Sequence, residues 1–186
     1  MLNQIAAIHG VGTPAVTNSY ESIATVTVGA GGSSSISFTS IVGTYKHLQL
    51  RGFARGTGAA ASYAINMRFN SDSATNYNVH GLYGDGSSAA AFGVANATVV
   101  QIDRITGAGA TANNFGSFVA DILDYANTNK YKTARILGGF DNNGSGEIDF
   151  DSGAWRSTSA ITSITLTLGT GNFAQYSHFA LYGIKG

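Results

Sequence analysis

The chain contains no cysteine and a single proline, Pro14. Without cysteine, a disulfide framework and a thiolate metal site are both excluded. Charge is scarce as well: charged residues make up 11% of the 186 residues, against roughly 25% in a typical soluble domain. The ten basic residues balance ten acidic ones and form no cluster, whereas nucleic-acid binders carry a basic patch for the phosphates. We therefore expect no nucleic-acid partner.

Long apolar runs are also missing. No segment approaches the roughly 18 consecutive apolar residues that predict a membrane-spanning helix. The first ten residues, MLNQIAAIHG, lack the basic region of a secretory signal peptide. The sequence thus predicts no membrane insertion.

The sequence is instead rich in glycine and in segments where apolar and polar residues alternate with a period of two. The chain has 25 glycines and 44% hydrophobic residues, which favours many short strands joined by turns over a disordered chain. Apolar and polar residues alternate from residue 21 onward, the pattern of strands with one buried and one wet face. Glycine-rich turn signals fall at 29–32, 84–88, 107–114 and 141–146. The expected strands cover 24–28, 35–39, 47–51, 63–69, 97–105, 116–124, 131–138, 147–155, 164–168 and 177–184.

About ten short strands at this spacing predict an all-β fold, a two-sheet antiparallel β-sandwich of jelly-roll type. Residues 1–20, which include Pro14, show no periodicity and are interpreted as an extended N-terminal arm. Residues 21–186 form the β-sandwich domain, without a linker that would divide it. The segment 177–184 is apolar on both faces, which predicts a central strand.

The wet faces of the expected strands carry Thr, Ser, Asn and Gln where most proteins have Lys and Glu. Charged side chains normally protect strand edges from pairing with other chains. Their scarcity favours a protein whose edges are covered by neighbours, most simply in a homo-oligomer.

The segment 141–149, DNNGSGEID, resembles the first half of an EF-hand loop. Its oxygen ligands would be Asp141, Asn143, Ser145 and Asp149, the chemistry that Ca²⁺ prefers. The position of the bidentate glutamate is Ser152, and no helices flank the loop. A hairpin turn is the favoured interpretation, with Glu147, Asp149 and Asp151 on the solvent face of the following strand, and a weak Ca²⁺ site is the alternative. No other cofactor is expected.

A second candidate site lies in the segment 76–86, which is read as a loop. Its Tyr77, His80, Tyr83 and Asp85 combine aromatic faces with polar groups, as a carbohydrate-binding loop requires. The competing interpretation, which we favour, is an Asn- and Asp-rich connection whose tyrosines close one end of the sandwich. Trp155, the only tryptophan, is interpreted as a core or interface anchor.

Catalytic motifs are not evident. The four histidines, His9, His47, His80 and His178, show no metal-ligand spacing, and no nucleophile-elbow or dinucleotide-binding motif occurs. Asp121 and Asp124 could supply the two carboxylates of a glycosidase by number alone, although a solvated strand face explains them better. The sequence predicts a protein that is not an enzyme.

Several short segments of the sequence resemble segments of small structural proteins of tailed-phage particles. They are YESIATVTVG at 20–29, GGSS at 31–34, ISF at 36–38, TYKHLQLRG at 44–52, MRFN at 67–70 and LYGDGSS at 82–88. The resemblance covers residues 20–90 and continues more loosely to 176–184. Val42 departs from it, since proline is expected in the turn before Thr44.

This resemblance implies a virion protein of the tail, fibre or capsid-surface type, and it implies no active-site residues. The first hypothesis is therefore a structural component that assembles with other virion proteins and is anchored by its arm. The alternative is an adhesin that binds a host-surface glycan through 76–86 or 141–151. A polysaccharide depolymerase that uses Asp121 and Asp124 is the third hypothesis.

Overall fold

The computed structural model describes residues 19–186, and this part of the chain consists of strands and loops without helices. The strands are β1 (Tyr20–Thr27), β2 (Ser35–Phe38), β3 (His47–Ala54), β4 (Ser62–Phe69), β5 (Tyr77–Gly84), β6 (Ala89–Ala97), β7 (Val100–Thr106), β8 (Gly116–Leu123), β9 (Lys132–Asp141), β10 (Gly146–Trp155), β11 (Ile164–Leu168) and β12 (His178–Ile184). No helix of the described residues is long and apolar enough to cross a membrane.

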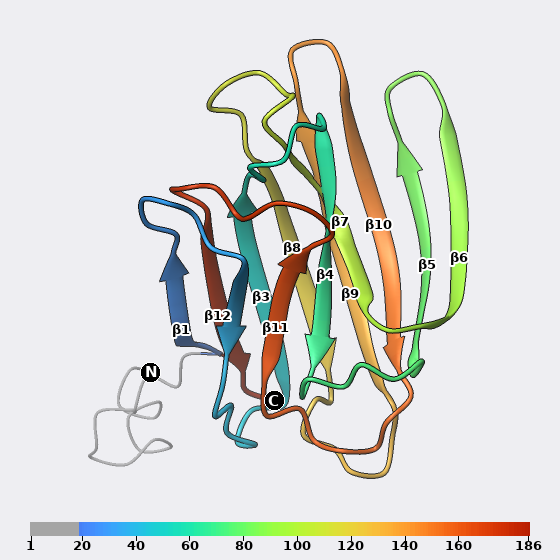
Figure 1. Cartoon of the computed structure of the whole chain (residues 1–186). Coiled ribbons are helices and arrows are strands. Elements are labelled where there is room, and N and C mark those ends of the chain that lie inside the picture. The colour runs from blue at the N-terminus through green and yellow to red at the C-terminus, as the bar shows by residue number, and fades with distance from the viewer. Residues whose placement is uncertain (1–18) are drawn as a thin grey trace, which may run out of the picture.

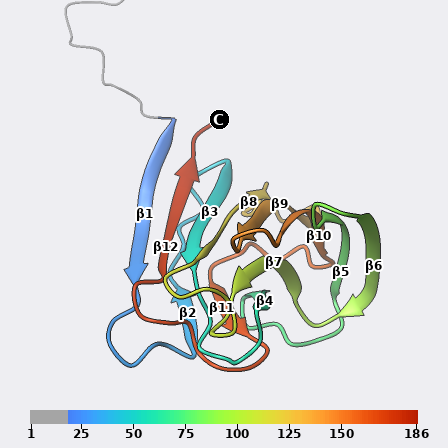
Figure 2. The same cartoon turned by 90° about the horizontal axis from the view of Figure 1, so that it is seen from above.

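The strands form two antiparallel sheets that pack face to face (Figure 1). The larger sheet has eight strands in the order β1-β12-β3-β8-β9-β10-β5-β6, and the smaller has four in the order β2-β11-β4-β7. Seen from above, the large sheet curves, so that β5 and β6 lie beyond β7 at the edge of the small sheet (Figure 2). The predicted two-sheet antiparallel β-sandwich is confirmed, and β12 has a partner strand on each side, as its two apolar faces suggest.

The core lies between the two sheets. Each strand of the small sheet contributes alternate apolar side chains, and the facing strands of the large sheet do the same. Trp155 belongs to this core: it is 2% exposed, lies beside Phe69 and Tyr77, and donates a hydrogen bond from Nε1 to Asp72 Oδ2 at 2.7 Å. The core members with the least exposure include Leu48, Leu50, Ile65, Met67, Ile102, Ile164, Leu166, Phe173, Phe179 and Leu181.

The expectation for residues 76–86 is wrong, because this segment is not a loop. Residues 77–84 form β5, which pairs with β10 on one side and with β6 on the other. The GDGSS turn at 84–88 was predicted correctly and joins β5 to β6. Strand β6 escaped prediction because its sequence, AAAFGVANA, is small and weakly alternating, with too little contrast between its faces.

The β9–β10 hairpin turns at Asn143 and Gly144, both of which have positive φ, at 50° and 94°. Positive φ at both central residues is the geometry of a type I′ turn, for which Asn-Gly is the preferred pair. The backbone N–H of Asn142 donates to Ser145 O at 2.6 Å and closes the turn. The favoured interpretation of this segment as a hairpin turn is thereby confirmed.

The predicted N-terminal arm, residues 1–20, lies almost wholly outside the described residues, as does His9. Its last residue, Tyr20, is the first residue of β1. The Lys185 backbone N–H donates to Ser19 O at 3.0 Å and attaches this point to the C-terminal end of the chain.

Candidate functional site

Strand β10 carries its polar and apolar side chains on the faces opposite to those expected. Asp149 and Asp151 are 5% and 2% exposed and point into the space between the sheets, whereas Ile148 and Phe150 are 62% and 52% exposed. The prediction that Glu147, Asp149 and Asp151 lie on the solvent face is therefore wrong. Residues two apart share a face of a strand, and Trp155 in the core places all odd-numbered residues of β10 inside.

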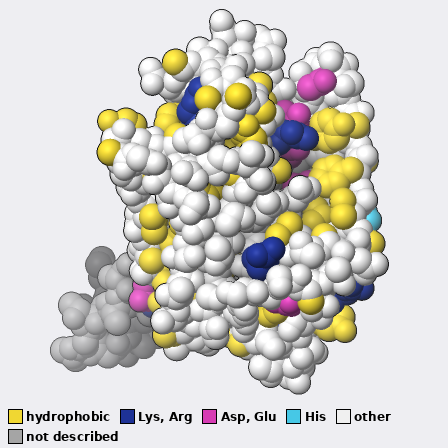
Figure 3. Space-filling view, in the orientation of Figure 1, with side chains coloured by type: hydrophobic (Ala, Val, Ile, Leu, Met, Phe, Trp, Pro, Cys, Tyr) yellow, Lys and Arg dark blue, Asp and Glu magenta, His cyan; other side chains and the backbone are white. Residues whose placement is uncertain are grey.

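The inward carboxylates line a cleft between the sheets, here called the inter-sheet cleft, with a volume of about 340 Å³. The cleft opens where the edge strand β7 faces β10, β5 and β6. Figure 3 shows acidic and basic side chains in a hollow on this face, beside a strip of hydrophobic side chains on the β5–β6 side. The residues of the cleft are Ala64, Tyr83, Phe92, Gln101, Ile102, Arg104, Glu147, Asp149 and Asp151.

The electrostatics of the inter-sheet cleft depend on how its acids are paired. Arg104 Nε lies 2.7 Å from Glu147 Oε1, an ion pair at the mouth of the cleft. Burial and, to a lesser extent, the neighbouring Glu147 and Asp151 carboxylates together raise the pKa of Asp149 to about 7, while Arg104 opposes them. Within residues 19–186, the Oδ2 atom of Asp149 has no hydrogen-bond partner. The cleft thus contains a buried acid that is partly protonated at neutral pH.

Gly81 of β5 provides the space in which the acid and an aromatic ring meet. A Cβ atom at this position would lie 2.1 Å from Asp151 Oδ1 and 2.3 Å from Phe92 Cε1. In the sheet, Gly81 is the direct neighbour of Asp151 on β10 and of Phe92 on β6. Only glycine leaves room for both groups on the inner face.

The four predicted ligand residues of the segment 76–86 do not come together. Tyr77 is fully buried, and its hydroxyl is 3.2 Å from Phe69 N and 3.1 Å from Asp72 O, so it is a core residue that closes one end of the sandwich. His80 is exposed on the outer face of β5, and Asp85 closes the β5–β6 turn by accepting hydrogen bonds from the backbone N–H groups of Ser87 and Ser88. These bonds lower the pKa of Asp85. Of the four, only Tyr83 lines the cleft.

The four predicted Ca²⁺ ligands are divided in a similar way. Asp141, Asn143 and Ser145 are exposed at the β9–β10 turn. Asp149 is buried, and it pairs with Gly138, three residue pairs along the hairpin from Asp141 and Gly146. At about 3.3 Å per residue, this places Asp149 roughly 10 Å from the end of the hairpin. Among the described residues, no group of three or more His, Asp or Glu side chains is arranged to hold a metal ion. A Ca²⁺ site at this turn stays a prediction, without Asp149.

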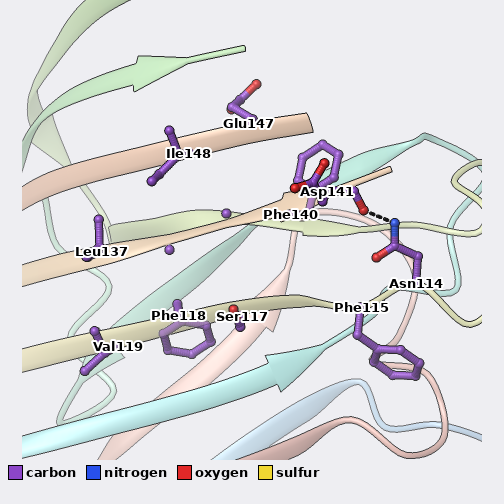
Figure 4. Close-up of a pocket in the computed structure, with 12 residues that line it drawn as sticks. Asn114, Phe115, Ser117, Phe118, Val119, Leu137, Phe140, Asp141, Glu147 and Ile148 are labelled. Carbon is purple, nitrogen blue, oxygen red and sulfur yellow. Dashed lines mark hydrogen bonds between the residues drawn. The ribbon is translucent and has the colours of Figure 1, made fainter. Parts of the chain in front are cut away.

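The outer face of the large sheet carries a second feature, a row of apolar side chains from neighbouring strands. The register places Leu82 of β5 beside Phe150 of β10, Phe150 beside Leu137 of β9, and Leu137 beside Val119 of β8. Leu82, Phe150 and Leu137 are exposed, and so is Ile148 in the next row. We call the surface formed by Leu82, Val119, Leu137, Ile148 and Phe150 the outer apolar face. Figure 4 shows Ile148, Leu137 and Val119 on three adjacent strands.

A broad groove of about 680 Å³ borders the outer apolar face. Its floor includes Gly139 and Ser117, which lie side by side between Ile148 and Phe53. Phe53 stacks on Phe115 with ring centroids 5.1 Å apart. Asn114 Nδ2 donates to the Asp141 backbone oxygen at the end of the groove (Figure 4). The groove is therefore walled by apolar side chains on both sides.

The acids considered for a depolymerase lie apart from the inter-sheet cleft. Asp121 is on the outer face of β8 and accepts a hydrogen bond from Gln49 Nε2 at 2.7 Å. Asp124 lies just beyond β8, where it pairs with Lys46 at 3.1 Å and Lys130 at 2.6 Å. These two lysines lower its pKa to about 2. Both carboxylates are thus engaged at the surface of the large sheet.

Sequence reasoning missed most of the inter-sheet cleft. Gln101 and Arg104 come from β7, Phe92 from β6 and the acids from β10, so sequence spacing does not associate them. One signal was available: the core role of Trp155 fixes which face of β10 is buried, and the same period of two places Asp149 and Asp151 on that face.

Comparison with known proteins adds little to this geometry. No family model and no curated protein matches the chain. Among solved structures, the chain is similar to the galectin LEC-6 of Caenorhabditis elegans, with 11% sequence identity and a TM-score of 0.33 over 87% of this chain and 96% of the galectin. A likeness this slight carries no argument, and the fold rests on the sheets described above.

Proposed function

We propose that the protein is a non-enzymatic structural component of a phage particle, on the capsid or tail surface, which acts by assembling with other copies of itself and with neighbouring virion proteins. The observation that carries the proposal is the outer apolar face. Contiguous apolar surface on a soluble protein is typical of protein–protein interaction sites, whereas scattered single apolar residues are not. Here the register makes Leu82, Phe150 and Leu137 direct neighbours.

Strand β6 supports the same proposal. It is an edge strand of nine residues, AAAFGVANA, with neither charge nor proline. Natural edge strands usually carry such residues to prevent pairing with other chains. An unprotected edge next to an apolar face favours a partner at this side of the sheet.

A second copy of this chain is the partner that the charge distribution favours. Net charge is zero, so two copies do not repel each other. The next row of the outer face brings Arg135 of β9 opposite Asp121 of β8. A row that contains both a positive and a negative side chain can pair with the same row of a second copy across a twofold axis, as in isologous interfaces. The resemblance of residues 20–90 to tailed-phage structural proteins supports the assignment to a virion.

Light scattering of the intact chain over a range of concentrations tests the assembly. We expect an oligomer that dissociates in the double variant Leu137→Ser/Phe150→Ser. Both side chains are exposed in the monomer, so the variant should remain folded with little loss of stability. Tyr176→Ser, which removes another exposed aromatic ring outside the outer apolar face, is the control and should leave the oligomer intact.

The particle itself provides the second test. Mass spectrometry of purified virions from a phage that encodes this chain should detect the protein at a copy number that fits particle symmetry. An intact chain that is monomeric at high concentration and absent from virions would overturn the proposal.

A further inference from the structure

The inter-sheet cleft combines three kinds of group that rarely meet by accident of packing. Asp149 and Asp151 offer acceptors, Gln101 offers both a donor and an acceptor, and Arg104 offers donors at the mouth. Tyr83 and Phe92 add aromatic surface on the β5–β6 side. Ligand pockets typically combine such apolar walls with a few directed polar groups.

Asp149 gives an independent indication of a ligand. The residue is only 5% exposed, and its Oδ2 atom has no hydrogen-bond partner among the described residues. Buried polar atoms are nearly always hydrogen-bonded, and each exception requires an explanation. A ligand hydroxyl in the cleft would donate the missing hydrogen bond.

We propose that the inter-sheet cleft binds one neutral sugar unit of a glycan, with Asp149 and Asp151 accepting hydrogen bonds from its hydroxyls and Tyr83 or Phe92 packing on its C–H face. The site lies on the opposite side of β10 from the outer apolar face. Sugar binding is thus a further activity that does not depend on assembly.

The charge balance of the cleft favours a neutral ligand over an ionic one. Arg104 pairs with Glu147, so this cation and this anion largely cancel. The pKa of Asp149, raised to about 7 mainly by burial and also by its acidic neighbours, leaves this acid partly neutral. The two carboxyl groups on one wall of the cleft, Asp149 and Asp151, disfavour an anionic sugar. Sugar hydroxyls both donate and accept hydrogen bonds, which matches the mixture of hydrogen-bond acceptors and donors that line the cleft.

The size and position of the cleft set the size of the ligand. About 340 Å³ is at the lower end of the range of small-molecule pockets, which suits a single ring better than an oligosaccharide. The cleft opens at the edge strand β7, so the rest of a glycan chain can extend into solvent.

A printed array of neutral, N-acetylated and sialylated glycans, probed with the full-length protein, is the first experiment. The terminal sugar of the strongest signal is then titrated as its methyl glycoside by calorimetry. We expect binding of a neutral terminal sugar. Asp149→Leu, which replaces the carboxyl by an apolar group of similar size, should weaken it about tenfold or more, and Tyr83→Ala should do the same.

Two matched controls lie on the outer face of the same sheet. Asp121→Leu makes the same replacement as Asp149→Leu, and Tyr182→Ala makes the same truncation as Tyr83→Ala, and neither should change the affinity. A ligand-induced rise in melting temperature in the wild type, absent from both cleft variants, separates lost binding from lost folding.

The proposal is overturned if no glycan binds, if binding survives both cleft variants, or if spermidine binds the cleft in place of sugars. The double variant Leu137→Ser/Phe150→Ser keeps the cleft and should bind sugar like the wild type. A failure of assembly and a failure of sugar binding are therefore distinguishable.

Discussion

Asp149 retains its proton over a pH range in which the same residue of the unfolded chain has lost it. Its pKa is raised from 3.8 to about 7 by burial and by Glu147 and Asp151, against the opposing Arg104 on β7. Between these pH values the unfolded state binds fewer protons, so stability falls as pH rises through this window. We expect this group to cost roughly 4 kcal/mol by pH 8, since the pKa differs by about three units and one unit corresponds to about 1.4 kcal/mol.

Urea unfolding of the wild type and Asp149→Asn at pH 4 and pH 8 measures this effect. Because Asn does not titrate, the variant should gain stability relative to the wild type as pH rises from 4 to 8. The difference between the two proteins cancels the contributions of groups that do not interact with Asp149, including Asp85 and Asp124, whose lowered pKa values act at more acidic pH. An equal pH dependence of both proteins would show that Asp149 ionises normally.

Gly81 allows a comparison between two glycines of one strand. A Cβ atom at Gly81 would overlap Asp151 Oδ1 at 2.1 Å and Phe92 at 2.3 Å, whereas at Gly84 the nearest atom is 3.6 Å away. Gly81→Ala should therefore destabilise the protein by about 1–3 kcal/mol, the typical cost of overpacking. Gly84→Ala should have little effect. Thermal unfolding of both variants tests this, and equal melting temperatures would contradict the packing around Asp151.

At the scale of the strand, alternation predicted where β10 lies but not which of its faces is buried. The rule that the apolar face of an alternating strand is buried would place Ile148 and Phe150 inside. The sequence of this strand alone contains no signal that contradicts the rule. The face is decided at the far end of β10, where Gly153 leaves space for Val100 and Trp155 packs on Phe69. Because residues two apart on a strand share a face, Asp149 and Asp151 lie on the same buried face as Gly153 and Trp155.

The candidate site was less predictable than the fold for the same reason. The sandwich follows from local alternation and turn chemistry, such as Asn143-Gly144, which the sequence displays directly. The inter-sheet cleft depends on which strands become neighbours: β7 follows β6 in the chain but joins the other sheet. Gln101 and Arg104 face the acids of β10 only because of this crossing, which no residue pattern encodes.

Lys132 links two connections at one end of the large sheet. It is 1% exposed, and its Nζ donates to the backbone oxygens of Asn127 at 2.6 Å, Lys130 at 2.8 Å and Thr158 at 3.2 Å. Burial lowers the pKa of this lysine. Lys132→Met would remove the common donor of these three carbonyls, so we expect a loss of roughly 2 kcal/mol or more.

Lys130→Met is the control for this element. The side chain of Lys130 is mostly exposed and pairs with Asp124 at 2.6 Å, and such surface pairs contribute at most about 1 kcal/mol. Chemical denaturation should rank Lys132→Met well below Lys130→Met in stability. The reverse ranking would mean that the 127–130 and 157–158 connections do not depend on Lys132.

For the molecule as a whole, the two proposed activities, assembly and sugar binding, use opposite sides of β10. The outer apolar face and the edge strand β6 suit assembly, and the inter-sheet cleft opens on the other side of the same sheet. A copy packed against the outer face leaves the mouth of the cleft at β7 free. A multimer would then present several sugar sites on one particle, and several weak sites bind a surface more strongly than one.

The N-terminal arm makes the last prediction at this scale. Residues 1–20 are expected to help anchor the chain to a neighbour, and β1, which follows them, is the other edge strand of the large sheet. A variant that lacks residues 1–18 retains every described strand and should therefore stay folded. We expect it to form a weaker oligomer than the intact chain in light scattering, and to bind sugar with unchanged affinity, because the cleft lies at the opposite end of the sheet from β1. If both chains assemble equally well, the interface lies wholly within the sandwich, and the anchoring role of the arm is wrong.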